Sequence, residues 1–137
     1  MGFALARYNG DGSLDTTWNT DGKVVNNFGD QSFSAVIALQ PNGKILLAGQ
    51  IRYSSTGADF ALARYTSDGE LDPLFGVDGF VSTNFVDFDD TIYGLVIQSD
   101  GKIVVAGSAN IYYSKSEFGL ARYLGDRFIY LPFVDRP

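Results

Sequence analysis

The stretch Phe3-Ala4-Leu5-Ala6-Arg7-Tyr8 decides the fold, because it occurs three times in a chain of 137 residues. It returns unchanged at residues 60–65 and again as Phe118-Gly119-Leu120-Ala121-Arg122-Tyr123. The copies begin 57 and 58 residues apart, a period typical of stacked structural repeats. We therefore divide the chain into tandem repeats over residues 1–123, with copies that start near Phe3, Phe60 and Phe118. A divergent tail, 124–137, is a possible capping strand.

Two further motifs recur with the same offsets. A turn of the pattern Asp-Gly-x-Leu-Asp lies at 11–15 and 68–72. The pattern (Leu/Ile)-Gln-x-(Asn/Asp)-Gly-Lys-Ile-x-x-Ala-Gly lies at 39–49 and 97–107, and its Asn-Gly or Asp-Gly pair is a strong hairpin signal. Each repeat thus predicts four antiparallel strands, a to d. Strand a is expected at 33–39 and 91–97, strand b at 44–49 and 102–107, strand c at the Phe-x-Leu-Ala-Arg-Tyr stretches, and strand d at 22–28 and 79–85.

The strands differ in polarity, and this difference predicts the architecture. Strands a and b are almost continuously apolar, as in Ile45-Leu46-Leu47-Ala48, which indicates sheets covered on both faces. Strand d is more polar, as expected of an exposed edge. The prediction is an all-β chain of four-stranded antiparallel propeller blades, about two to two and a half per chain. The alternative is a β-sandwich of two repeats.

The composition excludes several classes of function. The chain has no cysteine and no histidine, so thiolate or imidazole metal sites and a Ser-His-Asp triad are absent, and we expect no metal and no cofactor. A net charge of −6 argues against nucleic acid as a partner. No apolar run reaches the length of a membrane span, so we expect no membrane insertion, and the first residues do not resemble a signal peptide.

Taken together, the three motifs resemble the delta-60 repeat family, tandem repeats of large bacterial surface or secreted proteins. The resemblance covers about residues 3–123. It implies a β-propeller and an extracellular or cell-surface location, and it implies no biochemical activity. Residues 124–137 depart from the pattern, although the apolar segment 128–134 is able to substitute for a strand d.

A propeller ring needs about four to eight blades, more than this chain supplies. Three arrangements would cover the free sheet faces. The chain is a piece of a longer repeat protein, or three or four copies form a closed homo-oligomer, or the sheets remain an open stack with capped ends.

One residue position per copy is a candidate ligand site. Arg7, Arg64 and Arg122 each follow an apolar run, and in a ring their guanidinium groups would form a circle able to hold a carboxylate or phosphate. The alternative is that each arginine pairs with an aspartate of its own copy, such as Asp15 or Asp72.

The predicted loops between strands b and c, residues 50–59 and 108–117, vary between the copies and carry aromatic residues. Tyr53, Tyr112 and Tyr113 are candidates for stacking on a glycan or anchoring a protein partner. Sequence drift in a tolerant loop is the alternative reading.

Two groups of oxygen-bearing residues are weaker candidates. Asn9, Asp11, Ser13 and Asp15 alternate loosely as in a calcium loop, but Asx-turn chemistry explains them without a metal. Asp87, Asp89 and Asp90 would suit a carboxylate-based hydrolase, and the alternative is a solvated acidic loop.

The sequence thus predicts a non-catalytic propeller repeat module that acts as a scaffold or interaction surface. A glycan-binding, lectin-like oligomer is the alternative, and a carboxylate-based hydrolase is a weaker one.

Overall fold

The computed structural model describes residues 2–54, 57–85, 88–112, 115–125 and 130–134. These residues form ten strands and one short 3₁₀ turn, η1, at Trp18–Thr20. The strands are β1 (Phe3–Ala6), β2 (Lys23–Asn26), β3 (Gln31–Leu39), β4 (Ile45–Tyr53), β5 (Gly57–Tyr65), β6 (Phe80–Thr83), β7 (Asp90–Ile97), β8 (Ile103–Tyr112), β9 (Lys115–Tyr123) and β10 (Tyr130–Val134).

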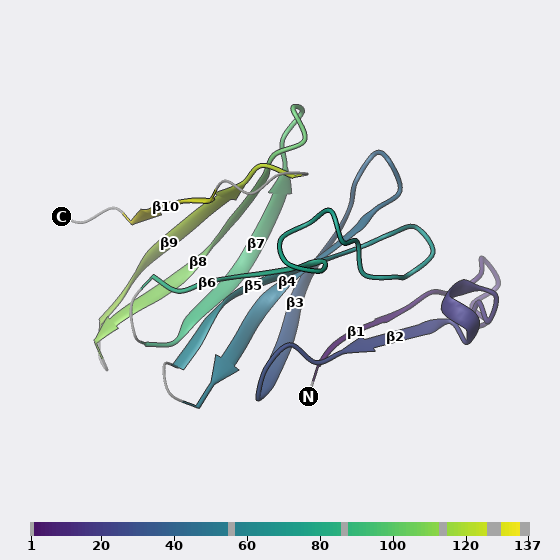
Figure 1. Cartoon of the computed structure of the whole chain (residues 1–137), viewed down its shortest axis with the longest axis horizontal. Coiled ribbons are helices and arrows are strands. Elements are labelled where there is room, and N and C mark those ends of the chain that lie inside the picture. The colour runs from purple at the N-terminus through teal and green to yellow at the C-terminus, as the bar shows by residue number, and fades with distance from the viewer. Residues whose placement is uncertain (1, 55–56, 86–87, 113–114, 126–129, 135–137) are drawn as a thin grey trace.

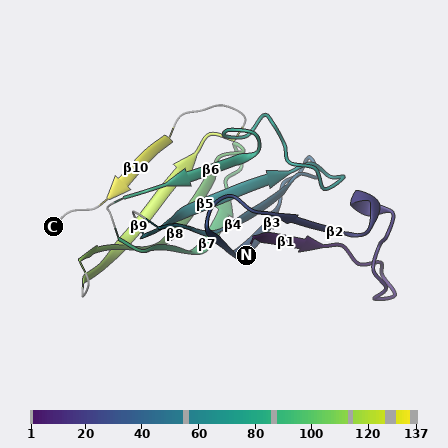
Figure 2. The same cartoon turned by 60° about the horizontal axis from the view of Figure 1, so that its bottom comes forward.

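The strands form three antiparallel sheets that follow one another along the chain (Figure 1). We call the two-stranded sheet β1–β2 the half-blade, the sheet β3-β4-β5-β6 blade 1, and the sheet β7-β8-β9-β10 blade 2. A view turned by 60° shows the half-blade at one end of the row and β10 near the other (Figure 2). The predicted all-β fold of four-stranded antiparallel blades is confirmed.

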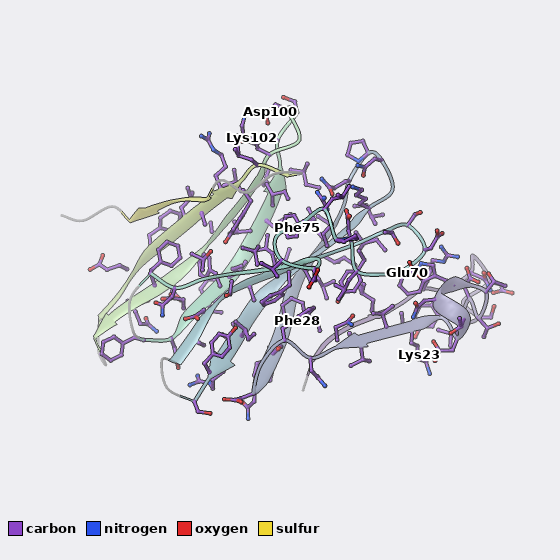
Figure 3. The ribbon with its side chains drawn as sticks, viewed as in Figure 1. Lys23, Phe28, Glu70, Phe75, Asp100 and Lys102 are labelled. Carbon is purple, nitrogen blue, oxygen red and sulfur yellow. The ribbon has the colours of Figure 1, made fainter. Side chains whose placement is uncertain are left out.

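Strands β4 and β5 of blade 1 are covered on both faces, as their continuously apolar sequences predict. One face packs on blade 2 through a cluster that includes Leu46 and Phe60, and the other packs on the half-blade through a cluster that includes Phe3 and Leu47. Phe75 and Phe28 point into these two layers (Figure 3). Blade 1 is thus the inner member of a three-layer stack, which a two-sheet sandwich does not contain.

The loops predicted between strands b and c are wrong in their extent, because both strands continue into them. β4 runs to Tyr53 and β5 begins at Gly57, with Tyr53 paired to Gly57. In blade 2, β8 runs to Tyr112, which pairs with Lys115. Polar residues alternate with apolar ones here, as in Gln50-Ile51-Arg52, because only one side chain in two is buried. A half-buried strand end of this kind has the polarity of a loop.

The other deviations are smaller. Strand d is short in both cases, with four residues each in β2 and β6. The tail provides β10, which pairs with β9 at the position that β6 has beside β5. Within the described residues, no helix is long and apolar enough to cross a membrane.

Candidate functional site: the open blade faces

The junction between blade 1 and blade 2 shows how one blade contacts the next. Phe60 is fully buried there, and its ring meets Phe85 edge-to-face with the centroids 5.0 Å apart. The hydroxyls of Thr83 and Tyr123 form a buried hydrogen bond of 2.7 Å across the junction. The aliphatic contacts come from Leu46, Ala48 and Leu62 on blade 1 and from Ile92, Ile103, Val105 and Ala121 on blade 2. At this junction, blade 1 presents the face that carries Phe60 and blade 2 presents the face that carries Tyr123. We call these two kinds of surface the phenylalanine face and the tyrosine face.

The outer face of blade 2 repeats the phenylalanine face, but no described residue covers it. Phe118 stands at the position of Phe60, yet it is 62% exposed where Phe60 is 0% exposed. The register pairs Arg122 with Val104, and Leu120 with Ala106, which places these residues on one face. We call this surface the open face of blade 2, formed by Val96, Val104, Ala106, Phe118, Leu120 and Arg122. An exposed aromatic and aliphatic surface of this kind is a candidate interaction site.

The outer face of the half-blade repeats the tyrosine face. Tyr8 is 64% exposed, whereas Tyr65 and Tyr123, its counterparts in the other copies, are buried. Val25 lies opposite Ala4 in the register and is also exposed. We call this surface the open face of the half-blade, formed by Ala4, Ala6, Tyr8, Lys23 and Val25. The two ends of the stack thus carry a phenylalanine face and the part of a tyrosine face that strands c and d form.

The junction between the half-blade and blade 1 contains a less complete polar contact. Asn26 and Tyr65 stand at the positions that Thr83 and Tyr123 have in the next junction. Among the described residues, no hydrogen-bond partner reaches Asn26 Oδ1 or the Tyr65 hydroxyl, although both atoms are buried. Burial also raises the pKa of Tyr65, so the hydroxyl stays protonated.

The arginines of the first two copies pair with aspartates, which confirms the structural alternative for these two. Arg7 contacts Asp15 through Nε at 2.9 Å, and Arg64 contacts Asp72 through Nε at 2.8 Å. The environments differ, because the Arg7 side chain is 45% exposed and that of Arg64 only 1%. Arg122 lies exposed on the open face of blade 2. An anion-binding role for the three arginines stays a prediction.

The Arg64 site is a buried charge network. Lys44 Nζ reaches the same Asp72 oxygen at 2.8 Å, and the guanidinium lies 4.8 Å from the centroid of Phe75 and donates to the carbonyl of Gly125 at 3.1 Å. Burial raises the pKa of Asp72, but the hydrogen bonds from Lys44 and the Leu74 N–H and the charges of Arg64 and Lys44 outweigh it. The pKa of Asp72 therefore lies below its usual value.

Two of the predicted aromatic loop residues, Tyr53 and Tyr112, lie at the ends of the b–c hairpins. Tyr53 is partly buried and packs against the core between blade 1 and the half-blade. Tyr112 ends β8, but its side chain lies outside the described structure, and Tyr113 lies outside the described residues. A glycan-stacking role for these tyrosines stays a prediction.

Asp89 and Asp90, at the start of β7, both form hydrogen bonds with other segments of the chain. Asp89 accepts from Arg52 at 2.7 Å and from the Ala58 N–H at 3.0 Å, and these bonds, the Arg52 bond first, lower its pKa. Asp90 is fully buried and accepts from the backbone N–H of Phe85 at 3.0 Å. The solvated loop expected here is therefore wrong for Asp90, since β7 begins at this residue. Asp87 lies outside the described residues.

The environment of Asp90 favours its neutral form. Burial raises the pKa of Asp90 to about 6, although the N–H groups of Phe85 and Asn110 stabilise the charge. The nearby charges of Asp59 and Asp89 raise the pKa further. Among the described residues, no group of three or more acidic side chains could hold a metal ion.

The calcium-like spacing in the first c–d turn forms hydrogen bonds within the turn. Asp11 Oδ1 accepts from the backbone N–H of Ser13 at 2.9 Å and from its hydroxyl at 2.6 Å. Asn9 donates to the Ser13 hydroxyl at 3.0 Å, and Asp15 accepts from Thr17. The Asx-turn explanation is confirmed for these residues.

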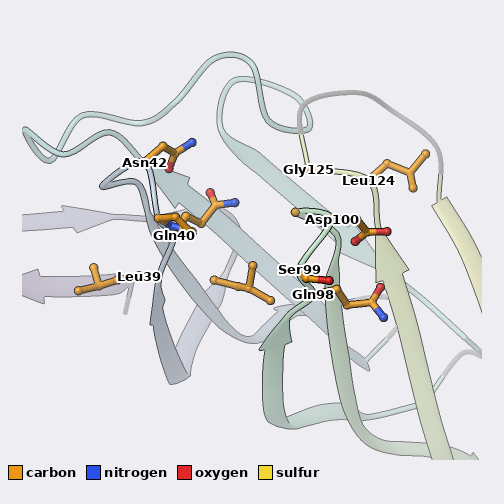
Figure 4. Close-up of a pocket in the computed structure, with 11 residues that line it drawn as sticks. Leu39, Gln40, Asn42, Gln98, Ser99, Asp100, Leu124 and Gly125 are labelled. Atoms are coloured by element: carbon orange, nitrogen blue, oxygen red, sulfur yellow. The ribbon is translucent and has the colours of Figure 1, made fainter.

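A groove of about 560 Å³ lies between the a–b turns of the two blades (Figure 4). It is lined by Leu39, Gln40, Pro41, Asn42, Ile97, Gln98, Ser99, Asp100, Gly101, Leu124 and Gly125. Asp100 pairs with Lys102 at its rim (Figure 3). The sequence could not reveal this groove, because two turns from different repeats form it.

The comparison with protein families matches this repeated architecture. The family described as "Domain of unknown function (DUF5122) beta-propeller" matches residues 2–17, 40–75 and 98–126, which is more than half of the chain. The chain belongs to this β-propeller family. Comparisons of the DUF5122 chain with curated proteins and with solved structures gave no significant match.

The segments that match DUF5122 contain most of the blade junction. Phe60, Leu62 and Arg64 lie inside them, and so do their exposed counterparts Phe118 and Leu120. The strands a and d, at 18–39 and 76–97, lie outside the match. The open face of blade 2 is thus built largely from the segments that the DUF5122 match covers.

Sequence reasoning predicted free sheet faces from the number of blades, but it did not identify the residues that form them. It treated Phe118 as one more copy of Phe60, because identical residues carry no sign of which copy lacks a neighbour.

Proposed function

We propose that this chain is a non-catalytic β-propeller module that acts as a scaffold and interaction surface through its open blade faces. The observation that supports this function is the contrast between Phe60 and Phe118, which lie in nearly the same sequence motif and have opposite exposure. A face that is buried wherever a blade lies beside it is suited to bind another blade.

The partner best suited to these faces is a second copy of the chain. The open face of blade 2 is of the phenylalanine kind and the open face of the half-blade is of the tyrosine kind, so two copies can join head to tail. Such a contact is heterologous and closes into a ring when the rotation between copies allows it. Three or four copies would supply six or eight four-stranded sheets, two from each chain, with the half-blade of one copy placed against blade 2 of the next.

The cell-surface or secreted location is part of the proposal and rests on the resemblance to delta-60 repeats. Labelling of intact cells with a membrane-impermeant reagent tests it. Labelling of this chain would support the location, and labelling only after lysis would refute it.

Sedimentation velocity over a range of concentrations tests the interaction function. We expect the wild type to associate and Phe118→Lys to remain monomeric, because the lysine would place a charge in the centre of the contact. Tyr8→Lys should act in the same way from the other end.

Leu74→Lys is the matched control, since Leu74 is 66% exposed and lies in a turn outside both open faces. It should associate like the wild type. Equal association of Phe118→Lys and Leu74→Lys would contradict the proposed function.

A further inference from the structure

The groove between the a–b turns of blade 1 and blade 2 contains a buried amide. Gln40, which lines the groove, is only 9% exposed, whereas Gln98, at the same position of the next copy, is exposed. Among the described residues, no hydrogen-bond partner reaches Gln40 Oε1, although this atom is buried. A buried amide without a partner has lost its hydrogen bonds to water, so a ligand that bonds to it is stabilised.

The Gln40 amide can turn either of its polar atoms toward the groove. The terminal torsion of a glutamine side chain is broad and roughly two-fold, so rotation of the amide plane exchanges oxygen and nitrogen. Asn42 lies on the same side of the groove, and Ser99 and Asp100 lie on the other (Figure 4). Together these side chains offer both hydrogen-bond donors and acceptors.

The backbone of the two turns is already hydrogen-bonded. In blade 1, the Gly43 N–H donates to the carbonyl of Gln40 at 2.9 Å, and the Gln40 N–H donates to the carbonyl of Lys44 at 2.8 Å. In blade 2, the Gly101 N–H donates to the carbonyl of Gln98 at 2.9 Å. These turns therefore do not present the row of free backbone groups that an extended peptide requires. Recognition in the groove depends on side chains.

The charges around the groove favour a neutral ligand. Of the described residues that line it, Asp100 alone carries a charge, and this carboxylate pairs with Lys102. The lining therefore holds no cation that would attract an anion. A single paired carboxylate is also too few ligands for a divalent metal ion. Pro41, Ile97 and Leu124 add aliphatic surface between the polar groups.

We propose that this groove binds a neutral saccharide, with the Gln40 amide as its central contact. A sugar hydroxyl both donates and accepts, so it matches an amide that can present either atom. The aliphatic surface of Pro41 and Leu124 suits the C–H groups of a sugar ring, and a volume of about 560 Å³ is typical of small-molecule sites. Because none of the described lining residues is aromatic, the sugar has no ring to stack on, and we expect a dissociation constant of about 1 mM.

The saccharide site goes beyond the proposed interaction function and does not depend on it. Both walls of the groove come from one chain, at the junction between blade 1 and blade 2, whereas the assembly uses the open faces. Each proposal can therefore fail without the other. Sedimentation of Phe118→Lys reports on the assembly, and the experiment below leaves Phe118 unchanged.

The test is a titration of the isotopically labelled chain with neutral sugars, followed by NMR. The probes are glucose, galactose, mannose and N-acetylglucosamine, each as the free sugar and as a linear trisaccharide, at up to about 50 mM, well above the expected dissociation constant. We expect at least one probe to shift the backbone amides of Gly43 and Gly101 and the side-chain amide of Gln40. Tighter binding of the trisaccharide would support a polysaccharide as the source, and equal binding would support a free sugar. No shift with any probe would overturn the proposal.

Gln40→Met removes the amide and keeps the length of the side chain. The affinity for the sugar should fall by about tenfold, because the sugar loses its buried hydrogen bond. Gln31→Met is the matched control, since Gln31 is exposed at the other end of β3. It should bind the sugar like the wild type. Equal affinity of the wild type and Gln40→Met would overturn the assigned site.

A second variant covers the case in which Gln40→Met fails to fold. Ser99→Pro removes a hydroxyl from the groove, and the turn accommodates proline there, because Pro41 stands at the same position of the first copy. The affinity should fall by about threefold or more, since one hydrogen bond to the sugar is lost. Unchanged affinity in this variant would overturn the proposal.

Discussion

The buried Arg64–Asp72 pair and the exposed Arg7–Asp15 pair offer the same substitution in two environments. Asp72→Asn removes the negative charge that faces both Arg64 and Lys44, whose side chains are 1% and 22% exposed. Breaking a buried ion pair costs about 3–5 kcal/mol in unfolding free energy. We expect a loss near the lower end, about 3 kcal/mol, because asparagine keeps an acceptor and Lys44 retains some water.

Asp15→Asn is the matched control. Arg7 is largely solvated, and water replaces the lost carboxylate, so the unfolding free energy should change far less than in Asp72→Asn. Urea unfolding at neutral pH, monitored by Trp18 fluorescence and circular dichroism, measures both variants. Equal losses in the two variants would refute the claim that blade 1 is an inner, covered blade.

The pH dependence gives a second check on the same pair. The folded-state pKa of Asp72 lies below its usual value, so its contribution to stability is present above the unfolded pKa and is lost as pH falls through the folded one. The difference in unfolding free energy between the wild type and Asp72→Asn should therefore become smaller as the pH falls. A difference that grows as the pH falls would contradict the assignment.

Three further predictions concern single positions. Asp90 has a raised pKa of about 6, so its contribution to folding stability is present below the pKa of the unfolded state and is lost as the pH rises through about 6. Asp90→Asn should flatten this decline in stability, which thermal melts at a series of pH values measure. Asn26→Thr should raise the unfolding free energy by about 1 kcal/mol, because a hydroxyl can pair with the buried Tyr65 hydroxyl; an unchanged or lower value in urea would count against this contact. Gly107→Ala should lower the unfolding free energy by about 1–3 kcal/mol, because the added Cβ would overlap the Thr91 carbonyl oxygen. Gly94→Ala is the control, because its Cβ meets no atom within 4 Å. A similar loss of unfolding free energy in both variants would be inconsistent with the close approach at Gly107.

The blades were predictable because the same motifs and the same continuously apolar strands recur in each copy. Residues 45–48 are apolar without interruption, and the structure covers both faces of that strand. The b–c hairpins were missed because Gln50 and Arg52 alternate with the buried Ile51, and such alternation at a strand end is not distinguishable from a polar loop.

The candidate site was less predictable, because exposure is a property of neighbours. Phe60 and Phe118 sit in nearly the same motif, and only the arrangement of sheets separates the buried residue from the exposed one. The burial of Asp90 was likewise hidden, since an Asp-rich segment usually indicates solvent and the backbone contact to Phe85 depends on the tertiary fold.

The most direct test of the interaction function is the native mass of the unmodified chain, measured by native mass spectrometry across a range of concentrations. The head-to-tail account predicts three or four copies of the 14.9 kDa chain in a closed assembly. A monomer at every concentration would contradict the proposal that the open blade faces join copies of this chain.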